Sequence, residues 1–471
     1  MRLSSITARD VVGSLRFDAK FHLSRQNPLL QQLASGRWPM SSIGETFGKG
    51  QVWTGNIFSR VYAADASYGK PLLAPYDIFR YVPWSDKILS RSQVTQFERL
   101  EIKRGWLFIV CSGRNLGPVS IADKFCEQFT MSHDMVRIAV EPCENLFYIA
   151  AFLSTAHGQA AIRTDMNGSV IDHTDANLVA ALRYPLVDDG LRRRVASLFQ
   201  SGFEKREEAR LLLAETQRAY LRHFRLDNVE STFDADTTAR RFTISRSMLR
   251  DRIDAEPHAP RYAAWRDRIA RIGGCRLGKI ATVTKPASRY KTNYVDDPKY
   301  GIAMMNGRQI SQYRAIGLRW MSLGAFKDPD QFRLRTGTTL LTADGRAEEN
   351  LADCALVTDD RAGWGASGHV HRVSPNEGIE PGLVYLACSC TPVQAQLKAL
   401  ATGSVVDALS DVDVASVIVP YETSAAAKRL GAAAGRAWDL FSAAIKAEEA
   451  AIALLEAEFA EGQLQPRACC W

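Results

Sequence analysis

The hydrophobic positions of the chain follow a pattern that occurs twice. An apolar run at residues 105–111 is closed by Ser112, Gly113 and Arg114, which predicts a buried strand followed by a turn. A second run at residues 337–342 is closed by residues 344–346, Asp-Gly-Arg, in the same way. The pattern therefore predicts two similar sheet-containing bodies.

Each predicted strand is followed by shorter segments of mixed character. Amphipathic segments near residues 147–158 and 384–400 predict helices packed on a sheet. Aliphatic runs then lead into Pro185 and Pro420. Strands and helices mix without a regular strand–helix alternation, so we expect an α+β fold for each body.

Two long stretches, residues 191–224 and 424–460, are typical of long helices. The first contains no proline and one glycine. Its apolar or small residues recur at steps of three and four: Val195, Leu198, Gly202, Ala209, Leu212, Thr216 and Ala219. The second stretch carries a heptad stripe interrupted by Glu448: Trp438, Phe441, Ile445, Ile452, Leu455 and Phe459.

The two stripes predict that the helices pack on each other as an antiparallel coiled coil. Each would be about 50 Å long at about 1.5 Å per residue. The charges of the two helices also favour this pairing, because residues 191–225 hold nine basic residues against four glutamates, whereas the second helix is slightly acidic. The alternative is that each helix covers only its own body.

Short matches at a nearly constant spacing indicate that a whole domain is duplicated. Residues 16–19, Arg-Phe-Asp-Ala, return as Arg-Ile-Asp-Ala at residues 252–255. Residues 167–172, which contain Gly-Ser-Val, return at residues 402–407. A repeat this long is a domain rather than a solenoid unit, and two copies can be related by a pseudo-twofold axis.

Composition narrows the class of protein. The chain has 471 residues, 46% hydrophobic and 24% charged, with a formal net charge of +7. This is an ordinary globular balance with a mild basic excess that is compatible with nucleic acid. Nine cysteines without a framework spacing favour reduced thiols and a cytoplasmic location. No secretory signal and no apolar run of membrane length is present.

The chain shows no strong catalytic pattern. Adenosylmethionine and Walker fingerprints, methylation motifs and metal-ligand spacings are missing from the sequence, so we expect no catalytic residue, metal or cofactor. Asp77 or Asp86 with Glu101 and Lys103 imitates a metal-nuclease pattern, but 52 acidic residues make such a match expected by chance. His369 and His371 are expected on one surface face of a strand.

The order of body, long helix, similar body and long helix resembles the specificity subunit of type I restriction–modification systems. The resemblance covers about residues 10–460. It rests on the Arg-Phe-Asp-Ala and Arg-Ile-Asp-Ala segments that begin the two copies, the turn at residues 112–114, the Gly168-Ser169-Val170 element, and the aliphatic run into Pro185 before a charged helix. The second copy departs from it, since Asp344 replaces Ser112 and residues 362–368 have no counterpart.

The resemblance implies two target recognition domains separated by two antiparallel helices. The corresponding boundaries are recognition domain 1 at 1–190, spacer helix 1 at 191–227, linker and recognition domain 2 at 228–421, spacer helix 2 at 422–460, and a flexible tail at 461–471. Each domain would read one half of an asymmetric double-stranded DNA target, and the helices would set the spacing. Half-sites on one face of DNA lie about 34–36 Å apart, within the reach of such a helix.

The implied partners are two methyltransferase subunits, which would carry S-adenosylmethionine, with a translocase–nuclease subunit left open. A membrane is not implied. Two other hypotheses remain: a coiled-coil scaffold of a phage-defence complex that does not read DNA, and a stand-alone endonuclease.

Basic residues in polar stretches with aromatic neighbours are the candidate DNA contacts. They are Lys49, Arg60, Lys70, Arg91 and Arg114 in the first body, and Arg289, Lys291, Arg308 and Arg346 in the second. The candidate coiled-coil or partner contacts are Leu198, Leu212, Trp438, Phe441, Ile445, Ile452, Leu455 and Phe459.

Overall fold

The computed structural model forms two compact units. It describes residues 7–8, 11–12, 22–24, 26–113, 115–164, 172–227, 241–246, 249, 253–286, 290–324, 326, 328–347, 349–403 and 405–461. Unit 1 comprises Met1–Glu207 with Ala443–Arg467, and unit 2 contains Glu208–Ser442. The opening at residues 16–19, the Gly-Ser-Val element at 168–170, the linker at 228–240 and the tail after Glu461 lie outside the described residues.

Unit 1 contains two small sheets and a separate strand pair. The main sheet has the antiparallel order β2-β8-β5-β6, and the second sheet, β4-β3-β7, contains one parallel pair, β3 with β7. Strand β1 pairs with β9. The strands are β1 (Met40–Ser42), β2 (Val52–Thr54), β3 (Gly69–Leu73), β4 (Ile88–Ser90), β5 (Leu107–Val110), β6 (Val119–Ile121), β7 (Thr130–Met131), β8 (Met135–Ile138) and β9 (Arg183–Pro185).

Unit 2 repeats this topology strand for strand. Its main sheet has the order β11-β19-β15-β17, its second sheet contains the parallel pair β13 with β18, and β10 pairs with β21. Additions are β12, at the edge of the second sheet, and the pair β16 with β20. The strands are β10 (Cys275–Arg276), β11 (Ala281–Thr284), β12 (Tyr294–Val295), β13 (Ile302–Met305), β14 (Arg319–Met321), β15 (Thr339–Thr342), β16 (Asp344–Gly345), β17 (Cys354–Leu356), β18 (Gly365–Ala366), β19 (Val370–Pro375), β20 (Asp407–Ala408) and β21 (Ile418–Val419).

Short helices cover the sheets in a similar order in both units, except that a single helical turn at Leu277–Lys279 replaces α4 in unit 2. Unit 1 has α3 (Pro28–Leu33), α4 (Ile43–Phe47), α5 (Glu144–Ser154), α6 (Ala156–Ile162) and α7 (Ala176–Ala181). Unit 2 has α9 (Pro260–Arg271), α10 (Pro381–Ser389), α11 (Thr391–Ala399) and α12 (Asp411–Ser416). Mixed sheets and helices confirm the α+β class, and both predicted strands appear as β5 and β15.

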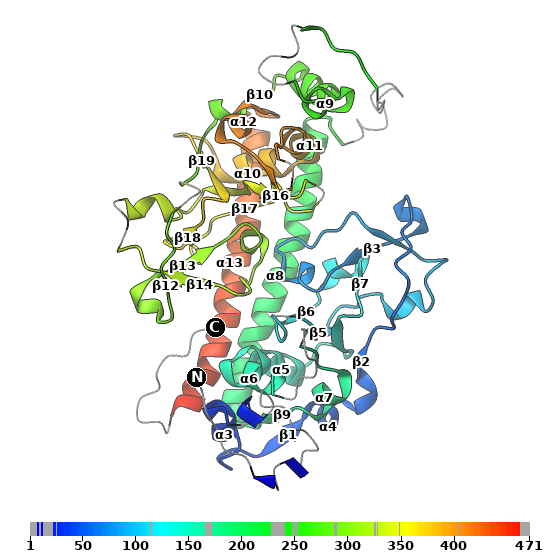
Figure 1. Ribbon diagram of the computed structural model, residues 1–471, viewed down its shortest axis with the longest axis vertical. Helices are drawn as coiled ribbons and strands as arrows, with labels where there is room; N and C mark the ends of the chain where they lie inside the picture. Colours follow the sequence, from blue (N-terminus) through cyan, green and yellow to red (C-terminus); the bar gives the residue numbers. More distant parts are fainter. Residues whose placement is uncertain are drawn as a thin grey trace. The chain divides into compact units, whose positions relative to one another are not determined.

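The segment near residues 147–158 differs from the amphipathic helix that we expected. Helix α5 is buried on every side from Leu146 to Leu153. It contacts β6 on one side, and Phe147 packs on Phe203 of the long helix α8, with ring centroids 5.6 Å apart, on another (Figure 1). Because the helix lies between a sheet and a helix, apolar residues occupy all its faces.

Two long helices were correctly predicted. Helix α8 spans Asp189–His223 and α13 spans Ala425–Ala460. Unit 1 contains the first half of α8 and the second half of α13, and unit 2 contains the other two halves. The start of one helix is therefore grouped with the end of the other, as antiparallel helices require. The Asp188 carboxylate accepts from the amides of Gly190 and Leu191, and the Ser424 hydroxyl accepts from the Ala427 amide, so each helix begins at a side-chain cap. None of the described helices is long and apolar enough to span a membrane.

Candidate nucleic-acid interface

A buried arginine joins the two sheets of unit 1. Arg137 on β8 donates to the carbonyls of Met135 (3.1 Å), Met131 (2.8 Å) and Ser132 (3.3 Å). Met131 ends β7 of the second sheet, whereas Met135 begins β8 of the main sheet. The guanidinium therefore fixes the loop through which the chain passes between the sheets.

Unit 2 contains the same arrangement at Arg372. This residue donates to the carbonyls of Val370 (2.7 Å), Ser367 (3.3 Å) and Ala366, two, five and six residues earlier, as Arg137 does. It also donates to the carbonyl of Phe332 at 3.3 Å. Burial lowers the pKa of both guanidinium groups to about 10, which leaves them protonated at neutral pH.

A glutamine forms a second matched contact. Gln159 on α6 donates to the carbonyls of Gly117 (2.9 Å) and Leu153 (2.8 Å). Gln394 on α11 donates to those of Ala352 (2.9 Å) and Cys388 (2.8 Å). Gly117 and Ala352 both have positive φ, +113° and +64°. The units therefore share hydrogen bonds as well as strand order.

The edge of the second sheet of unit 1 presents two exposed tyrosines. Tyr62 forms a bridge to Leu89 of β4, and Tyr68 ends a single helical turn in which the Asp65 carboxylate accepts from the Ser67 amide at 2.7 Å. Gly69 follows, and a Cβ there would lie 1.9 Å from the Leu89 carbonyl oxygen. The close approach of the strands thus requires glycine after the tyrosine.

Unit 2 repeats this edge. Tyr294 pairs with Met321 of β14, and Tyr300 ends a turn in which the Asp297 carboxylate accepts from the Lys299 amide at 3.1 Å. A Cβ on Gly301 would lie 2.8 Å from the Met321 carbonyl oxygen. We call these two surfaces, defined by Tyr62 and Tyr68 in unit 1 and by Tyr294 and Tyr300 in unit 2, the tyrosine edges.

The candidate cations of the first body lie on its surface but not in one cluster of free charges. Lys49, Arg60 and Arg91 are exposed, and Lys70 is half-buried. Lys70 and Arg91 both pair with Glu101, at 3.0 and 3.1 Å. Glu101 therefore neutralises part of the positive charge that the sequence suggested.

The candidates of the second body are more scattered. Lys291 and Arg308 are exposed. Arg346 is exposed beside β16 and lies 3.7 Å from Glu349. Arg114 and Arg289 lie outside the described residues.

The candidate surfaces of the two units differ. The residues that correspond to Lys70 and Arg91, 232 positions later, are Ile302 and Leu323. Arg308 corresponds to Tyr76. Only the turn of Arg114 and Arg346 carries a candidate cation in both copies, so the units present different polar groups on one framework.

The predicted helix contacts are mostly buried. Trp438, Phe441, Ile445, Leu455 and Phe459 are buried, whereas Leu198, Leu212 and Ile452 are half-buried. The aromatic residues pack on the bodies, with ring centroids of Phe459 and Trp38 5.3 Å apart and those of Trp438 and Tyr385 5.1 Å apart.

Glu448, which interrupts the heptad stripe, forms an ion pair inside unit 1. Its carboxylate accepts from the guanidinium of Arg206, which also donates to the Ile121 carbonyl at 3.1 Å. Both side chains are buried. Thus α8 and α13 meet in unit 1 through a buried charge pair.

The nuclease-like pattern does not form a metal site. Burial alone would raise the pKa of Glu101, but hydrogen bonds from Lys70 and Arg91 lower it. The Asp77 carboxylate accepts from the Ala74 amide, 2.8 Å away. In the described part of the chain, no group of three or more His, Cys, Asp or Glu side chains could hold a metal ion. The expectation that His369 and His371 share a surface face was wrong, because His371 is buried and its Nε2 donates to the Leu409 carbonyl at 3.0 Å.

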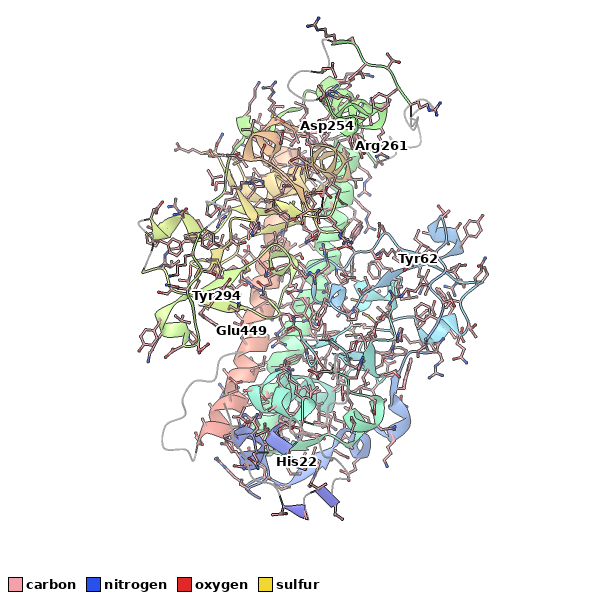
Figure 2. All side chains as sticks on the ribbon, in the orientation of Figure 1. His22, Tyr62, Asp254, Arg261, Tyr294 and Glu449 are labelled. Atoms are coloured by element: carbon pink, nitrogen blue, oxygen red, sulfur yellow. The ribbon has the colours of Figure 1, made fainter. Side chains whose placement is uncertain are left out.

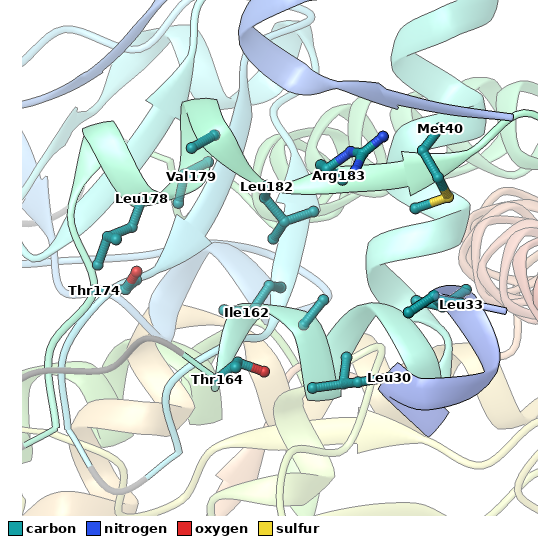
Figure 3. Close-up of a pocket in the computed structure, with 13 residues that line it drawn as sticks. Leu30, Leu33, Met40, Ile162, Thr164, Thr174, Leu178, Val179, Leu182 and Arg183 are labelled. Carbon is teal, nitrogen blue, oxygen red and sulfur yellow. The ribbon is translucent and has the colours of Figure 1, made fainter. Parts of the chain in front are cut away.

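Unit 1 also contains an apolar pocket of about 340 Å³. Leu30, Leu33 and Ile162 lie on one side of it, with Leu178 and Leu182 on another (Figure 3). Arg183 is the charged residue among its lining side chains. These side chains offer packing surface rather than chemistry.

Our sequence reasoning missed the buried arginines and the tyrosine edges. A signal existed for both. Ser-x₄-Arg occurs at residues 132–137 and 367–372, and Tyr-x₂-Asp-x₂-Tyr-Gly at residues 62–69 and 294–301. Both pairs keep the spacing of the other repeats.

Comparison with known proteins gives similarity only at the level of solved structures. No family model matches the chain, and no curated protein matches its sequence. The chain is similar over 90% of its length to the S subunit of a type I restriction–modification system from M. genitalium (12% identity, 94% of that chain, TM-score 0.30). It is also similar over 90% to the HsdS subunit from Thermoanaerobacter tengcongensis (14% identity, 97% of that chain, TM-score 0.28). A chain from a structure on the assembly and conformational transition of the type I R-M system is similar over 90% as well (13% identity, 96% of that chain, TM-score 0.28). The first two of these proteins carry the name of the family that the sequence resembles.

Proposed function

We propose that this chain is the specificity subunit of a type I restriction–modification system, which binds DNA and reads an asymmetric target in two parts. One observation carries the proposal: the chain holds one buried framework twice, under surfaces that differ. Arg137 and Arg372 represent the framework. The surfaces differ, for example, at Lys70 and Arg91 of unit 1, where unit 2 has Ile302 and Leu323.

A repeated framework with different surfaces suits a target of two unlike halves. Similar domains dock in similar ways, and different side chains at the base edges then select different sequences. The long helices α8 and α13 would hold the two readers at a set spacing. The candidate contacts remain those that the sequence suggested, with Lys49, Arg60, Arg91, Lys291, Arg308 and Arg346 exposed for the purpose.

We further propose that the chemistry belongs to partners. Two methyltransferase subunits would bring S-adenosylmethionine, and the chain itself would supply recognition. A translocase–nuclease subunit is compatible with this role but is not required by it.

The test is a methylome comparison. The chain is co-expressed with the adenine methyltransferase of its own genome, and a strain that lacks the chain serves as control. We expect adenine methylation at a single bipartite sequence with two different halves. Methylation without sequence preference, or no dependence on the chain, would exclude the proposal.

A matched pair of variants makes the test sharper. Arg308→Gln should relax the target at one half only, and Arg91→Gln at the other half only, because the residues belong to different units. A scaffold that does not read DNA predicts no change in either half. Capture of the methyltransferase that survives nuclease treatment, together with an unchanged methylome, would favour the scaffold instead.

A further inference from the structure

The tyrosine edges are surface features that the two units have in common. On most of the surface the units differ, although Arg346 is exposed at a position where unit 1 also has an arginine. Tyr62, Tyr68, Tyr294 and Tyr300 are shared and yet 45%, 68%, 43% and 64% exposed. Packing inside a unit leaves Tyr68 and Tyr300 mostly in solvent and more than two-fifths of Tyr62 and Tyr294 exposed.

Hydrogen bonds hold the backbone beneath each edge. The Asp65 and Asp297 carboxylates fix the turns, and hydrogen bonds from these turns lower the pKa of both groups. The Ser90 amide donates to the Val61 carbonyl at 2.9 Å, and the Ser322 amide donates to the Asn293 carbonyl at the same distance. Both tyrosines of a unit are therefore held beside one strand in a fixed geometry. Tyr62 and Tyr294 are labelled in Figure 2.

A cation stacks on a tyrosine in unit 2, and unit 1 has a lysine at the matching sequence position. In unit 2 the guanidinium of Arg319 lies 3.5 Å from the centroid of the Tyr294 ring. Lys87 occupies the corresponding position in unit 1, next to β4. Both are exposed. Exposed aromatic rings with a nearby cation are a surface suited to an anionic, partly apolar ligand such as the sugar–phosphate backbone.

We propose that the tyrosine edges contact the sugar–phosphate backbone of duplex DNA, one edge in each half of the target, and set the register of each unit without reading a base. This inference rests on the proposed function and adds to it. Residues that are the same in both units do not distinguish two different half-sites. The feature that the half-sites have in common is the backbone, to which tyrosine hydroxyls and cations donate hydrogen bonds.

The experiment measures the affinity of the purified full-length chain for two duplexes of equal length. One carries the target found by methylation mapping, and the other is unrelated. The variants are Tyr62→Phe with Tyr68→Phe in unit 1, and Tyr294→Phe with Tyr300→Phe in unit 2. Tyr262→Phe, which changes a half-buried tyrosine on α9 whose hydroxyl donates to Glu256, is the control outside the edges.

We expect each double variant to lose about three- to tenfold in affinity for both duplexes, because hydroxyl hydrogen bonds to phosphate are lost. The control should bind as the unmodified chain does. The slope of log affinity against log salt should stay unchanged, since no charge is removed. Lys87→Gln and Arg319→Gln should each reduce that slope by about one phosphate contact.

Two results would overturn the inference. Unchanged affinity of both double variants would show that the edges do not touch DNA. A loss confined to the target duplex would show that they read bases. If instead the unmodified chain binds neither duplex, the proposed function itself fails. Failure of the proposed function is therefore distinguishable from failure of the inference about the tyrosine edges.

Discussion

Unit 1 and unit 2 differ where α8 and α13 meet each other and agree where the two sheets meet. Arg206 and Glu448 form a buried ion pair in unit 1. Arg137 and Arg372 are 235 residues apart. At the same spacing, Arg206 corresponds to Phe441 and Glu448 corresponds to Leu213, and both of these unit 2 residues are buried and apolar.

The difference teaches which contacts a duplicated domain can exchange. A helix interface requires only filled volume, and an ion pair or two apolar side chains can supply it. The loop between the sheets requires a donor for several backbone carbonyls at once, and a guanidinium with its fixed geometry meets that requirement. The interior hydrogen bonds are therefore retained, and the helix contacts are free to change.

The largest expected effect separates the units. Glu448→Leu should destabilise unit 1 by about 3–5 kcal/mol, because the buried Arg206 loses its closest carboxylate and keeps only Asp123, 4.0 Å away, as an ion-pair partner. Hydrogen exchange followed by mass spectrometry in increasing urea should show faster exchange at β5 than in the unmodified chain, with β15 unchanged.

The control for this variant copies unit 2. Arg206→Phe together with Glu448→Leu removes both charges of the pair and should recover part of the lost stability, since the buried Asp123 then loses Arg206. Equal acceleration of exchange at β5 and β15 in the single variant would contradict the assignment of the pair to unit 1.

The second prediction tests the agreement between the units. Arg137→Met and Arg372→Met should each cost about 2–4 kcal/mol, because several buried carbonyls lose their donor. Exchange should accelerate at β8 in the first variant and at β19 in the second, by similar amounts. A large loss in one unit and none in the other would mean that the two arginines are not equivalent.

Much of the fold was predictable because its signals are periodic. The stripes of α8 and α13 repeat over many residues, and short apolar runs mark β5 and β15. The duplication itself was visible in short matches. Helix α5 was harder, since complete burial removes the polar face that marks a surface helix.

The surface was less predictable. A basic side chain in a polar stretch does not reveal that Glu101 pairs with both Lys70 and Arg91, because these residues are brought together only by the fold. Arg137 looks like any arginine that alternates along a strand. The tyrosine edges were visible as a repeat, but their exposure was not.

The third prediction is that the stability of both units depends on pH in the same way. Burial lowers the pKa of His157 in unit 1 and of His371 in unit 2 to about 4. The unfolded chain, with a histidine pKa of about 6.5, then binds more protons between these values. The stability that each neutral histidine contributes is complete above pH 6.5 and is lost as the pH falls toward 4.

Between pH 7 and pH 5 each histidine should account for about 1–2 kcal/mol of lost stability. Urea unfolding at both pH values measures it, and His157→Gln or His371→Gln should reduce the loss in its own unit. A pH dependence that neither substitution changes would place the effect on other groups.

The smallest expected effect concerns the starts of the two long helices, which lie in different units. Asp188→Ala and Ser424→Ala should each cost about 1 kcal/mol, because the first amides of α8 and α13 lose their acceptor. Asp188→Ser and Ser424→Asp keep an acceptor and should remain within a few tenths of a kcal/mol of the unmodified chain. Amide exchange in the first turn of each helix is the direct readout. Since the caps serve the same purpose in both units, a cost at one helix and none at the other would show that the helix starts, unlike the sheets, are not built alike.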